Sequence, residues 1–195
     1  VGVLVETGEA GWWPQDRPLP AGICVYATLD ELARADVTAA LVVTDRVLGE
    51  EHAPLLAKAV VYRPRSLVAG VGCKKGAPAG EIEGLVRQTL AEAGLSAGSV
   101  RNLASIEAKR GEPGLEEAAR RLGVPVEFYT AAELNAVEGT ESVSEAAQAA
   151  VGARGVCEPA ALRSAGAKRL LVSKRKTASV TVAVARVDFG KKITR

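Results

Sequence analysis

The sequence is poor in the residues on which metal sites and catalytic triads most often depend. Its 195 residues include no methionine and a single histidine, His52. One histidine leaves almost no material for a histidine-ligated metal or a histidine-based triad. The three cysteines, Cys24, Cys73 and Cys157, have neither a zinc spacing nor the spacing of a disulfide framework. We therefore expect reduced thiols.

Aromatic residues and excess charge are also scarce, and each scarcity excludes a class of partner. Aromatic side chains make up 4% of the residues and the formal net charge is +2. Both values are too low for a base-stacking surface or a nucleic-acid footprint. No apolar run approaches the roughly 18 residues of a membrane span. We expect a globular protein in the cytoplasm, with no nucleic-acid or membrane partner, because 48% of its residues are hydrophobic and 25% charged.

The first 60 residues have the pattern of a small α/β unit. Short apolar runs at 1–5, 22–27 and 38–43 predict strands. Thr28 and Glu31 have the spacing of a capping box and predict a helix between the second and third strands. Because the chain starts as though already inside a strand and lacks methionine, we expect its natural start to lie upstream.

A second α/β domain is predicted after Pro64, which interrupts the next apolar run. We place the domains at 1–62 and 63–190, followed by a tail at 191–195. Strands alternate with helices in the second domain, which predicts an α/β sheet with helices on its faces. The predicted strands are 67–71, an extended segment through 105–109, 124–130 and a closing hairpin with a polar turn at 174–179; the helices begin at Pro78 and Pro113 and cover 131–137, 142–152 and 157–166.

A glycine-rich corner, "GVGCKKGAP", joins the strand at 67–71 to the next helix. It is not a Walker A loop, because Ala77 follows Gly76 where a lysine and a hydroxyl residue are required, and it is not a GxGxxG fingerprint. Backbone N–H groups at 72–76, with Lys74 and Lys75, still predict a corner that favours anions. The alternative is that both lysines are solvated and the glycines only turn the chain.

Further candidate residues follow in the second domain. In an extended segment Ser105, Glu107 and Lys109 would face one side together. Glu112 and Glu158 each stand at the start of a helix, where complementing the helix dipole is as good an explanation as catalysis. Lys174 is expected in a turn, where solvation is the default. Cys73, without a histidine partner, is better explained as a buried, inert thiol than as a nucleophile or metal ligand.

Together these segments resemble the cobalamin-biosynthesis CbiG family. Four motifs carry the resemblance, in order: "YRPRSLVAGVGCKKG", "LASIEAKRGEPGL", "SVSEAAQAAVGARGVCEPAAL" and "LLVSKRKTASVTVAVARV". They span 62–187 and correspond to the family's C-terminal domain, which is shared with CobE. The segments "LPAGICVYATLDEL" and "ALVVTDR" are similar to the family's central region. Nothing in the chain resembles the family's N-terminal domain.

The resemblance implies a function. Family members are cobalt-precorrin 5A hydrolases of anaerobic cobalamin biosynthesis, which open the δ-lactone of a ring-contracted cobalt tetrapyrrole and release acetaldehyde. The cobalt would arrive inside the substrate, so no cofactor and no metal site built by the protein itself are expected. Neighbouring corrin-pathway enzymes are possible further partners. The alternative is a CobE-like module that binds or carries a corrin intermediate without hydrolysing it.

The residues can be given roles in that reaction. We expect Glu107 or Glu112 as the base and Lys109 as its electrostatic partner. Carboxylate arms of the substrate would bind at the corner. The expected binding residues are Gly72, Cys73, Lys74, Lys75, Gly76, Ser105, Glu158 and Lys174.

Overall fold

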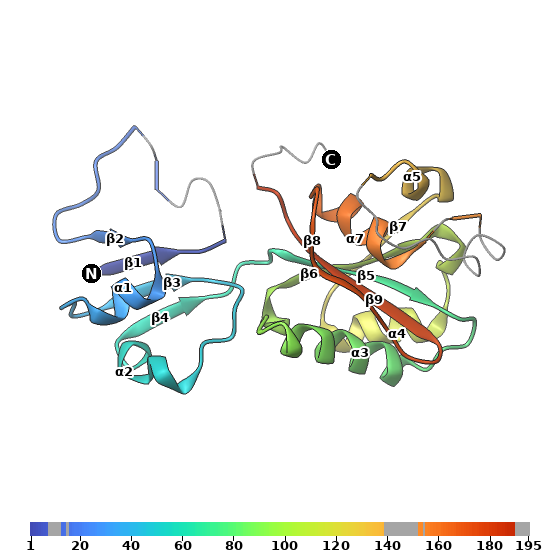
Figure 1. Ribbon diagram of the computed structural model, residues 1–195, viewed down its shortest axis with the longest axis horizontal. Coiled ribbons are helices and arrows are strands. Elements are labelled where there is room, and N and C mark those ends of the chain that lie inside the picture. Colours follow the sequence, from blue (N-terminus) through green and yellow to red (C-terminus); the bar gives the residue numbers. More distant parts are fainter. Residues whose placement is uncertain (8–12, 15, 139–151, 154, 190–195) are drawn as a thin grey trace. The chain divides into compact units, whose positions relative to one another are not determined.

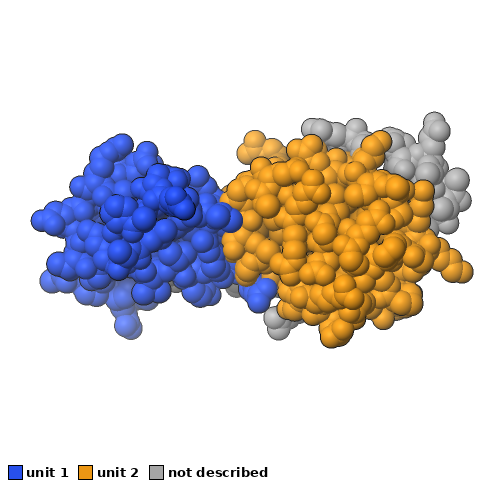
Figure 2. All heavy atoms as spheres, turned by 90° about the horizontal axis from the view of Figure 1, so that it is seen from below, with its two compact units in different colours: residues 1–65 blue, residues 66–195 orange. Residues whose placement is uncertain are grey.

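The computed structural model describes residues 1–7, 13–14, 16–138, 152–153 and 155–189. The chain divides into two compact units, residues 1–65 and 66–195 (Figure 2). The division lies three residues beyond the boundary placed at 62 and 63. The predicted helix at 142–152 and the tail at 191–195 fall largely or wholly outside the described residues. No helix within the described ranges is long and apolar enough to span a membrane.

Unit 1 is built on a parallel sheet with the strand order β2-β1-β3-β4. Its strands are β1 (Gly2–Val5), β2 (Cys24–Tyr26), β3 (Ala40–Val43) and β4 (Ala59–Tyr62), as the apolar runs predict. The helices are α1 (Leu29–Arg34) and α2 (Ala53–Leu56), the second preceded by a 3-10 turn, η1 (Glu50–His52). Leu4, Leu32, Val42 and Leu55 form the core between the helices and one face of the sheet.

The helix start in unit 1 follows the predicted cap with one difference. Thr28 Oγ1 accepts a hydrogen bond from the Glu31 backbone N–H at 3.2 Å. The Glu31 carboxylate returns a contact to the N–H of Ala27, at 3.1 Å, and not to that of Thr28. The cap is therefore present, while the reciprocal bond reaches one residue further back than a capping box requires.

Unit 2 is a mixed sheet with the order β7-β6-β5-β9-β8 and helices on both faces (Figure 1). The strands are β5 (Leu67–Cys73), β6 (Val100–Ile106), β7 (Val126–Tyr129), β8 (Leu170–Lys176) and β9 (Val180–Arg186). Strands β5, β6 and β7 are parallel, and β9 is antiparallel to both of its neighbours, β5 and β8. The predicted α/β class is confirmed.

Two helix layers enclose this sheet. On one face lie α3 (Ala79–Glu92) and α4 (Pro113–Leu122), which bury Ile82, Val86 and Leu115 in a common core. On the other lie α5 (Ala131–Asn135) and α7 (Cys157–Ala165), which pack on a second core. Short 3-10 turns, η2 (Ala97–Ser99) and η3 (Glu107–Lys109), stand before and after β6.

Helix α7 packs against β5 so closely that one strand position has no room for a side chain. A Cβ at Gly70 would collide with the carbonyl oxygen of Cys157 and the amide nitrogen of Ala161. Gly70 therefore allows helix and strand backbones to meet, which is a use of glycine known from strand interiors. Gly72 meets a different neighbour, because a Cβ there would lie 2.7 Å from Thr181 Oγ1 on β9.

We predict that Gly70→Ala destabilises unit 2. The added methyl meets backbone atoms that cannot rotate away, so the free energy of unfolding should fall by an amount at the upper end of the about 1–3 kcal/mol typical of overpacking. Urea unfolding followed by circular dichroism measures it. The matched control is Gly84→Ala on the open face of α3, which meets no atom within 4 Å and should stabilise by about 0.5–1 kcal/mol. Equal stability of the two variants would contradict the packing argument.

Candidate functional site

The carboxyl ends of the parallel strands of unit 2 meet at one edge of the sheet. Strand β5 ends at Cys73, β6 at Ile106 and β7 at Tyr129. Strand β9 begins at Val180, which pairs with Cys73, so the turn between β8 and β9 reaches the same edge. In open parallel sheets, ligands bind outside the carboxyl ends of the strands, where neighbouring connections leave in opposite directions. Here β6 leads into α4 on one face of the sheet and β7 leads into α5 on the other, and the corner after β5 lies at the same edge.

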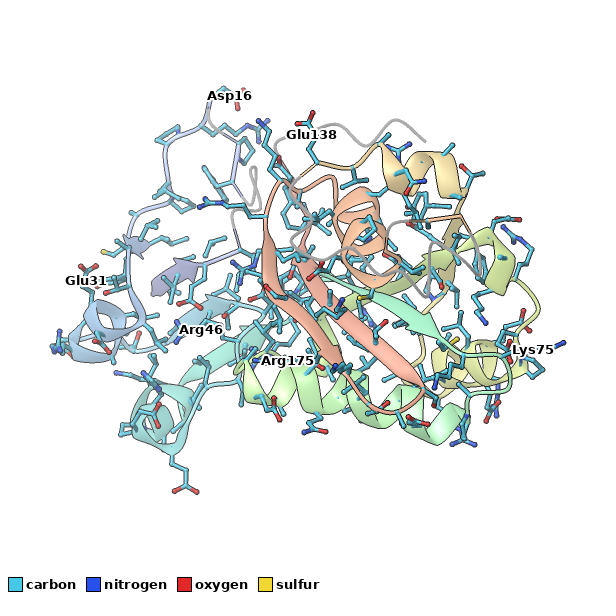
Figure 3. All side chains as sticks on the ribbon, turned by 45° about the vertical axis from the view of Figure 1, so that its right-hand side comes forward. Asp16, Glu31, Arg46, Lys75, Glu138 and Arg175 are labelled. Atoms are coloured by element: carbon cyan, nitrogen blue, oxygen red, sulfur yellow. The ribbon has the colours of Figure 1, made fainter. Side chains whose placement is uncertain are left out.

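The glycine-rich corner does bind a carboxylate, and the carboxylate belongs to the protein. The N–H of Gly76 donates to Glu112 Oε1 at 2.8 Å. Gly76 has a φ of +74°, a left-handed conformation that glycine adopts without strain. The Lys74 N–H donates to the carbonyl oxygen of Ser179 at 2.9 Å, which anchors the corner to the β8–β9 turn. Lys74 and Lys75 are exposed, and Lys75 extends outward (Figure 3).

Glu112, Lys109 and Cys73 form a half-buried polar cluster beside this corner. Lys109 Nζ lies 3.8 Å from Glu112 Oε2, and the two side chains are only 15% and 10% exposed. Burial raises the pKa of the Cys73 thiol, while the charge of Lys109 lowers it and that of Glu112 raises it. Cys73 is thus a protonated thiol at neutral pH, as expected of an inert cysteine.

The other candidate base, Glu107, has a different environment. Its carboxylate is about half exposed and accepts two hydrogen bonds from Arg110, at 2.7 and 2.9 Å. These hydrogen bonds hold the pKa of Glu107 below its usual value. The guanidinium of Arg110 lies over the Phe128 ring, 4.6 Å from its centroid. Glu107 is therefore held as a charged, salt-bridged surface group.

The predicted common orientation of Ser105, Glu107 and Lys109 is wrong. Strand β6 ends at Ile106 and the chain turns into η3, so the alternation of an extended segment stops before Glu107. Ser105 is fully buried, and its hydroxyl donates to the carbonyl oxygen of Val71 at 2.7 Å. Its polarity serves to connect β6 with β5.

The two remaining candidates, Glu158 and Lys174, meet on the α7 face of the sheet. Glu158 lies in the first turn of α7, is 3% exposed, and accepts a hydrogen bond from the Lys174 backbone N–H at 3.0 Å. The prediction that Lys174 occupies a turn is wrong, because β8 continues to Lys176 and the turn is shorter. Cys73 packs against the core under α3 and α4. Cys73 and Glu158, both predicted to bind substrate, thus lie on opposite faces of the sheet.

Cys157, next to Glu158, is also a thiol. Burial raises the pKa of Cys157 to about 11, above any value at which a thiolate would attack a substrate at neutral pH. All three cysteines are free. Within the described part of the chain, no three side chains of His, Cys, Asp or Glu gather as a metal site.

One residue that organises this edge has no signal in the sequence. Glu81, in the first turn of α3, accepts hydrogen bonds from the hydroxyls of Thr177 and Ser179, each at 2.5 Å, and from the Ser179 N–H at 3.2 Å. These bonds lower the pKa of Glu81. The carboxylate clamps the β8–β9 turn to α3. Its partners lie almost a hundred residues away along the chain, beyond the reach of any local pattern.

Comparison with known proteins identifies the family. Residues 67–185 match the family described as "Cobalamin synthesis G C-terminus". The chain belongs to the CbiG family. A cobalt-precorrin-5A hydrolase of Priestia megaterium is 39% identical to it over 189 residues, which are 97% of this chain and 50% of that protein. The resemblance expected from the four motifs is confirmed.

CobE proteins match the second unit of this CbiG-family chain. Protein CobE of a Sinorhizobium species is 40% identical over 121 residues, covering 61% of this chain and 79% of that protein. The crystal structure of a CobE from the cobalamin (vitamin B12) pathway superposes with a TM-score of 0.59 and 38% identity, covering 63% of this chain and 90% of that one. The chain spans about half the length of the hydrolase that it resembles.

We predict that Glu81→Gln makes the stability of unit 2 less dependent on pH. A carboxylate whose pKa is lowered by folding stabilises the folded state above its ordinary value of 4.5, and this contribution is lost as the pH falls through the lower, folded-state pKa. The difference in urea midpoint between wild type and Glu81→Gln should be largest near neutral pH and should shrink below pH 4.5. Glu138→Gln, at an exposed position (Figure 3), is the control; an equal loss in both would contradict the clamp.

Proposed function

We propose that this chain is the central and C-terminal part of a cobalt-precorrin-5A hydrolase and acts on a cobalt-bearing tetrapyrrole lactone. The observation that carries the proposal is the 39% identity to such a hydrolase along almost the whole chain. The site in unit 2 supports it, because a carboxylate, an ammonium group and backbone N–H groups adjoin at the carboxyl edge of the sheet.

The reaction consists of two steps that these groups suit. Water adds to the lactone carbonyl, the acyl–oxygen bond breaks, and the former ring oxygen leaves as a hydroxyl. Removal of that hydroxyl proton then lets the carbon–carbon bond to the macrocycle break, so that acetaldehyde departs and the macrocycle carbon takes up a proton. A positioned base serves both steps, and cationic or N–H donors stabilise the oxyanion of the first.

Glu112 is the better placed of the two candidate bases. Both oxygens of Glu107 are engaged by Arg110, whereas Glu112 offers Oε2 at 3.8 Å from Lys109 in a site that is largely withdrawn from water. Lys109 would then be the electrostatic partner of the base. The choice of Glu112 as the base also rests on its position beside the corner at the end of β5, where substrate would enter.

The corner would bind the acetate and propionate arms of the macrocycle. Lys74 and Lys75 are exposed cations on a loop whose Gly76 N–H already accommodates a carboxylate. Gly72 and Cys73 belong to the strand end that supports this loop. Ser105 and Glu158 bind backbone groups of the protein itself, so in this proposal they position β5 and β8 and do not touch substrate.

The second candidate is a CobE-like protein that binds a corrin intermediate without hydrolysing it. The share of each relative's length that the chain matches favours this function, because the chain matches 79% of a CobE sequence and only 50% of the hydrolase sequence. Such a protein would need the basic corner and would not need a base at Glu112.

We predict that Glu112→Gln abolishes turnover while leaving substrate binding in place. Acetaldehyde release from cobalt-precorrin 5A, coupled to NADH consumption by alcohol dehydrogenase, should fall by about 10²-fold or more, the usual effect of removing a general base. Glu107→Gln is the matched control and should stay within about threefold of the unchanged chain. Full activity of Glu112→Gln would remove it as the base. Binding without any release by the wild-type chain, beside an active full-length hydrolase, would favour the CobE-like function.

We predict that replacing Lys74 and Lys75 together by alanine weakens tetrapyrrole binding about tenfold at low salt, since each exposed cation contributes up to about 1 kcal/mol. The loss should diminish at high ionic strength, where exposed charges are screened. Titration followed by the absorbance of the macrocycle measures it. Arg34→Ala, which removes an exposed cation from α1, should leave affinity unchanged. Equal affinity of the double variant at every salt concentration would refute the corner as the carboxylate site.

A further inference from the structure

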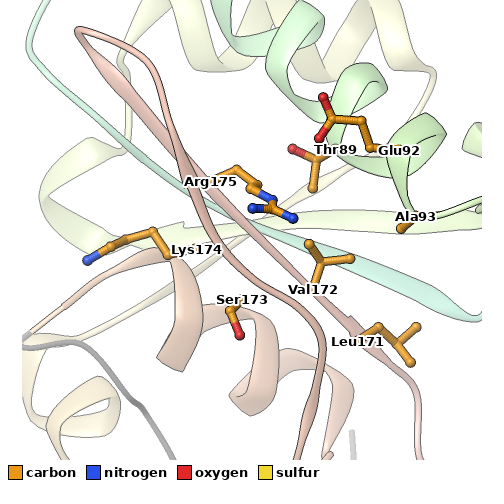
Figure 4. A pocket seen from close by; sticks show the side chains of 8 residues that line it. All are labelled: Thr89, Glu92, Ala93, Leu171, Val172, Ser173, Lys174 and Arg175. Atoms are coloured by element: carbon orange, nitrogen blue, oxygen red, sulfur yellow. The ribbon is translucent and has the colours of Figure 1, made fainter.

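The outermost strand of the unit 2 sheet borders a cavity that the proposed reaction does not use. Strand β8 ends the order β7-β6-β5-β9-β8 in the described part of the chain. Between β8 and the last turns of α3 lies a cavity of about 270 Å³ (Figure 4). Thr89, Glu92 and Ala93 form its helix side, and residues 171–175 form its strand side. This volume is just below the range of about 300–1,000 Å³ in which small ligands are enclosed, and it suits one or two inserted side chains.

A buried hydroxyl in the cavity wall lacks a partner. Thr89 is 1% exposed, and its Oγ1 makes no hydrogen bond among the described residues. A buried, unsatisfied polar group costs about 1–3 kcal/mol, so such groups in folded proteins usually indicate a bound water or ligand. A ligand group that accepts a hydrogen bond from Thr89 would remove this penalty.

Positive charge surrounds the same strand edge. The guanidinium of Arg175 points to the side of Thr89 and Glu92, whereas Lys174 points away from them (Figure 4). Glu92 is the one acid of the cavity wall, and its carboxylate accepts a hydrogen bond from Gln88 at 2.8 Å. The cations on β8 and its approach are Lys168, Arg169, Lys174, Arg175 and Lys176. Their charge outweighs that of Glu92 and favours an anionic ligand.

The strand itself offers backbone groups and an apolar contact. The pairing of β8 with β9 shifts register between Leu170 and Val172 and again between Val172 and Arg175. Leu171 is 40% exposed beside the cavity. An outermost strand can bind an extended segment through its outward N–H and C=O groups, and alternate side chains of that segment would then face α3. The Lys174 N–H is not available for this pairing, because it donates to Glu158.

We propose that β8 binds an extended acidic segment of a second protein by strand addition, with one of its carboxylate side chains in the α3–β8 cavity, bonded to Thr89 and Arg175. Cations on an edge strand also oppose self-pairing, but that role leaves the cavity and the unpartnered hydroxyl unexplained. A second copy of this chain does not fit. Among the described outermost strands β2, β4, β7 and β8, the one acidic residue is Glu127, which accepts hydrogen bonds from Tyr129 and Ser164.

The test uses two labelled seven-residue peptides, one alternating Asp with Val and one alternating Lys with Val. Fluorescence anisotropy with the whole chain should detect binding of the acidic peptide alone, and Arg175→Glu should weaken that binding at least about tenfold. Arg34→Glu, with the same charge change on α1, should weaken it less than about twofold. Hydrogen exchange of the backbone amides at 171–175 should slow when the acidic peptide is bound.

Thr89→Val separates binding from stability. Removing an unsatisfied buried hydroxyl should leave the chain as stable as wild type or more so, yet the variant should bind the acidic peptide several-fold more weakly. The proposal is overturned by equal binding of both peptides, by no binding of the acidic one, by binding without protection at 171–175, or by a dimer of the chain that Arg175→Glu dissociates. None of these outcomes depends on hydrolase activity, so the proposed reaction stands or fails separately.

Discussion

The backbone contact between α7 and β5 is the constraint on which unit 2 depends. Because Gly70 carries no side chain, the helix backbone reaches the centre of the sheet. This approach fixes the start of α7 beside β8, where Glu158 accepts the Lys174 N–H. It also leaves the opposite face of β5 to α3 and α4. The two helix layers that border the candidate site are thus placed by packing at one glycine.

The chemistry at the strand ends is organised by carboxylates that bind the protein's own N–H and O–H groups. Glu112 occupies the Gly76 N–H, and Glu81 occupies the hydroxyls of the β8–β9 turn. Each acid fixes a loop that has no other regular structure. A substrate carboxylate arriving at the corner would therefore meet the exposed ammonium groups of Lys74 and Lys75 and not the Gly76 N–H, which Glu112 already binds.

Local patterns in the sequence predict most of the fold. The apolar spacing of Ile82, Leu85 and Val86, the cap at Thr28 and the helix start at Pro113 all depend on neighbours within a few residues, and the structure has each of them. The errors occur where tertiary contacts decide. Glu107 lies in the 3-10 turn η3 and forms an ion pair with Arg110. Lys174 remains in a strand because β8 stays paired with β9 as far as Lys176.

The candidate site could be predicted only in part for the same reason. The corner at 72–76 with Lys74 and Lys75 follows a strand end, so its residue types and position already suggest an anion site, and Glu112 with Lys109 follows the next strand as a possible base and its partner. Glu81 could not be found, since its partners Thr177 and Ser179 become neighbours only through the sheet. The orientation shared by Ser105, Glu107 and Lys109 was predicted wrongly, because the sequence does not indicate that the chain turns after Ile106 or that the Ser105 hydroxyl donates to a backbone carbonyl of β5.

The place of β9 in the sheet has a consequence for biosynthesis. This strand, Val180–Arg186, is the last in sequence among the described residues, yet it lies between β5 and β8 in the interior of the sheet. A ribosome that has released only β5, β6 and β7 therefore exposes the unpaired side of β5, whose partner is still untranslated. Such an intermediate is open to misassociation until β9 emerges, and the long sequence separation between β5 and β9 should make closure of the sheet the slow step of folding.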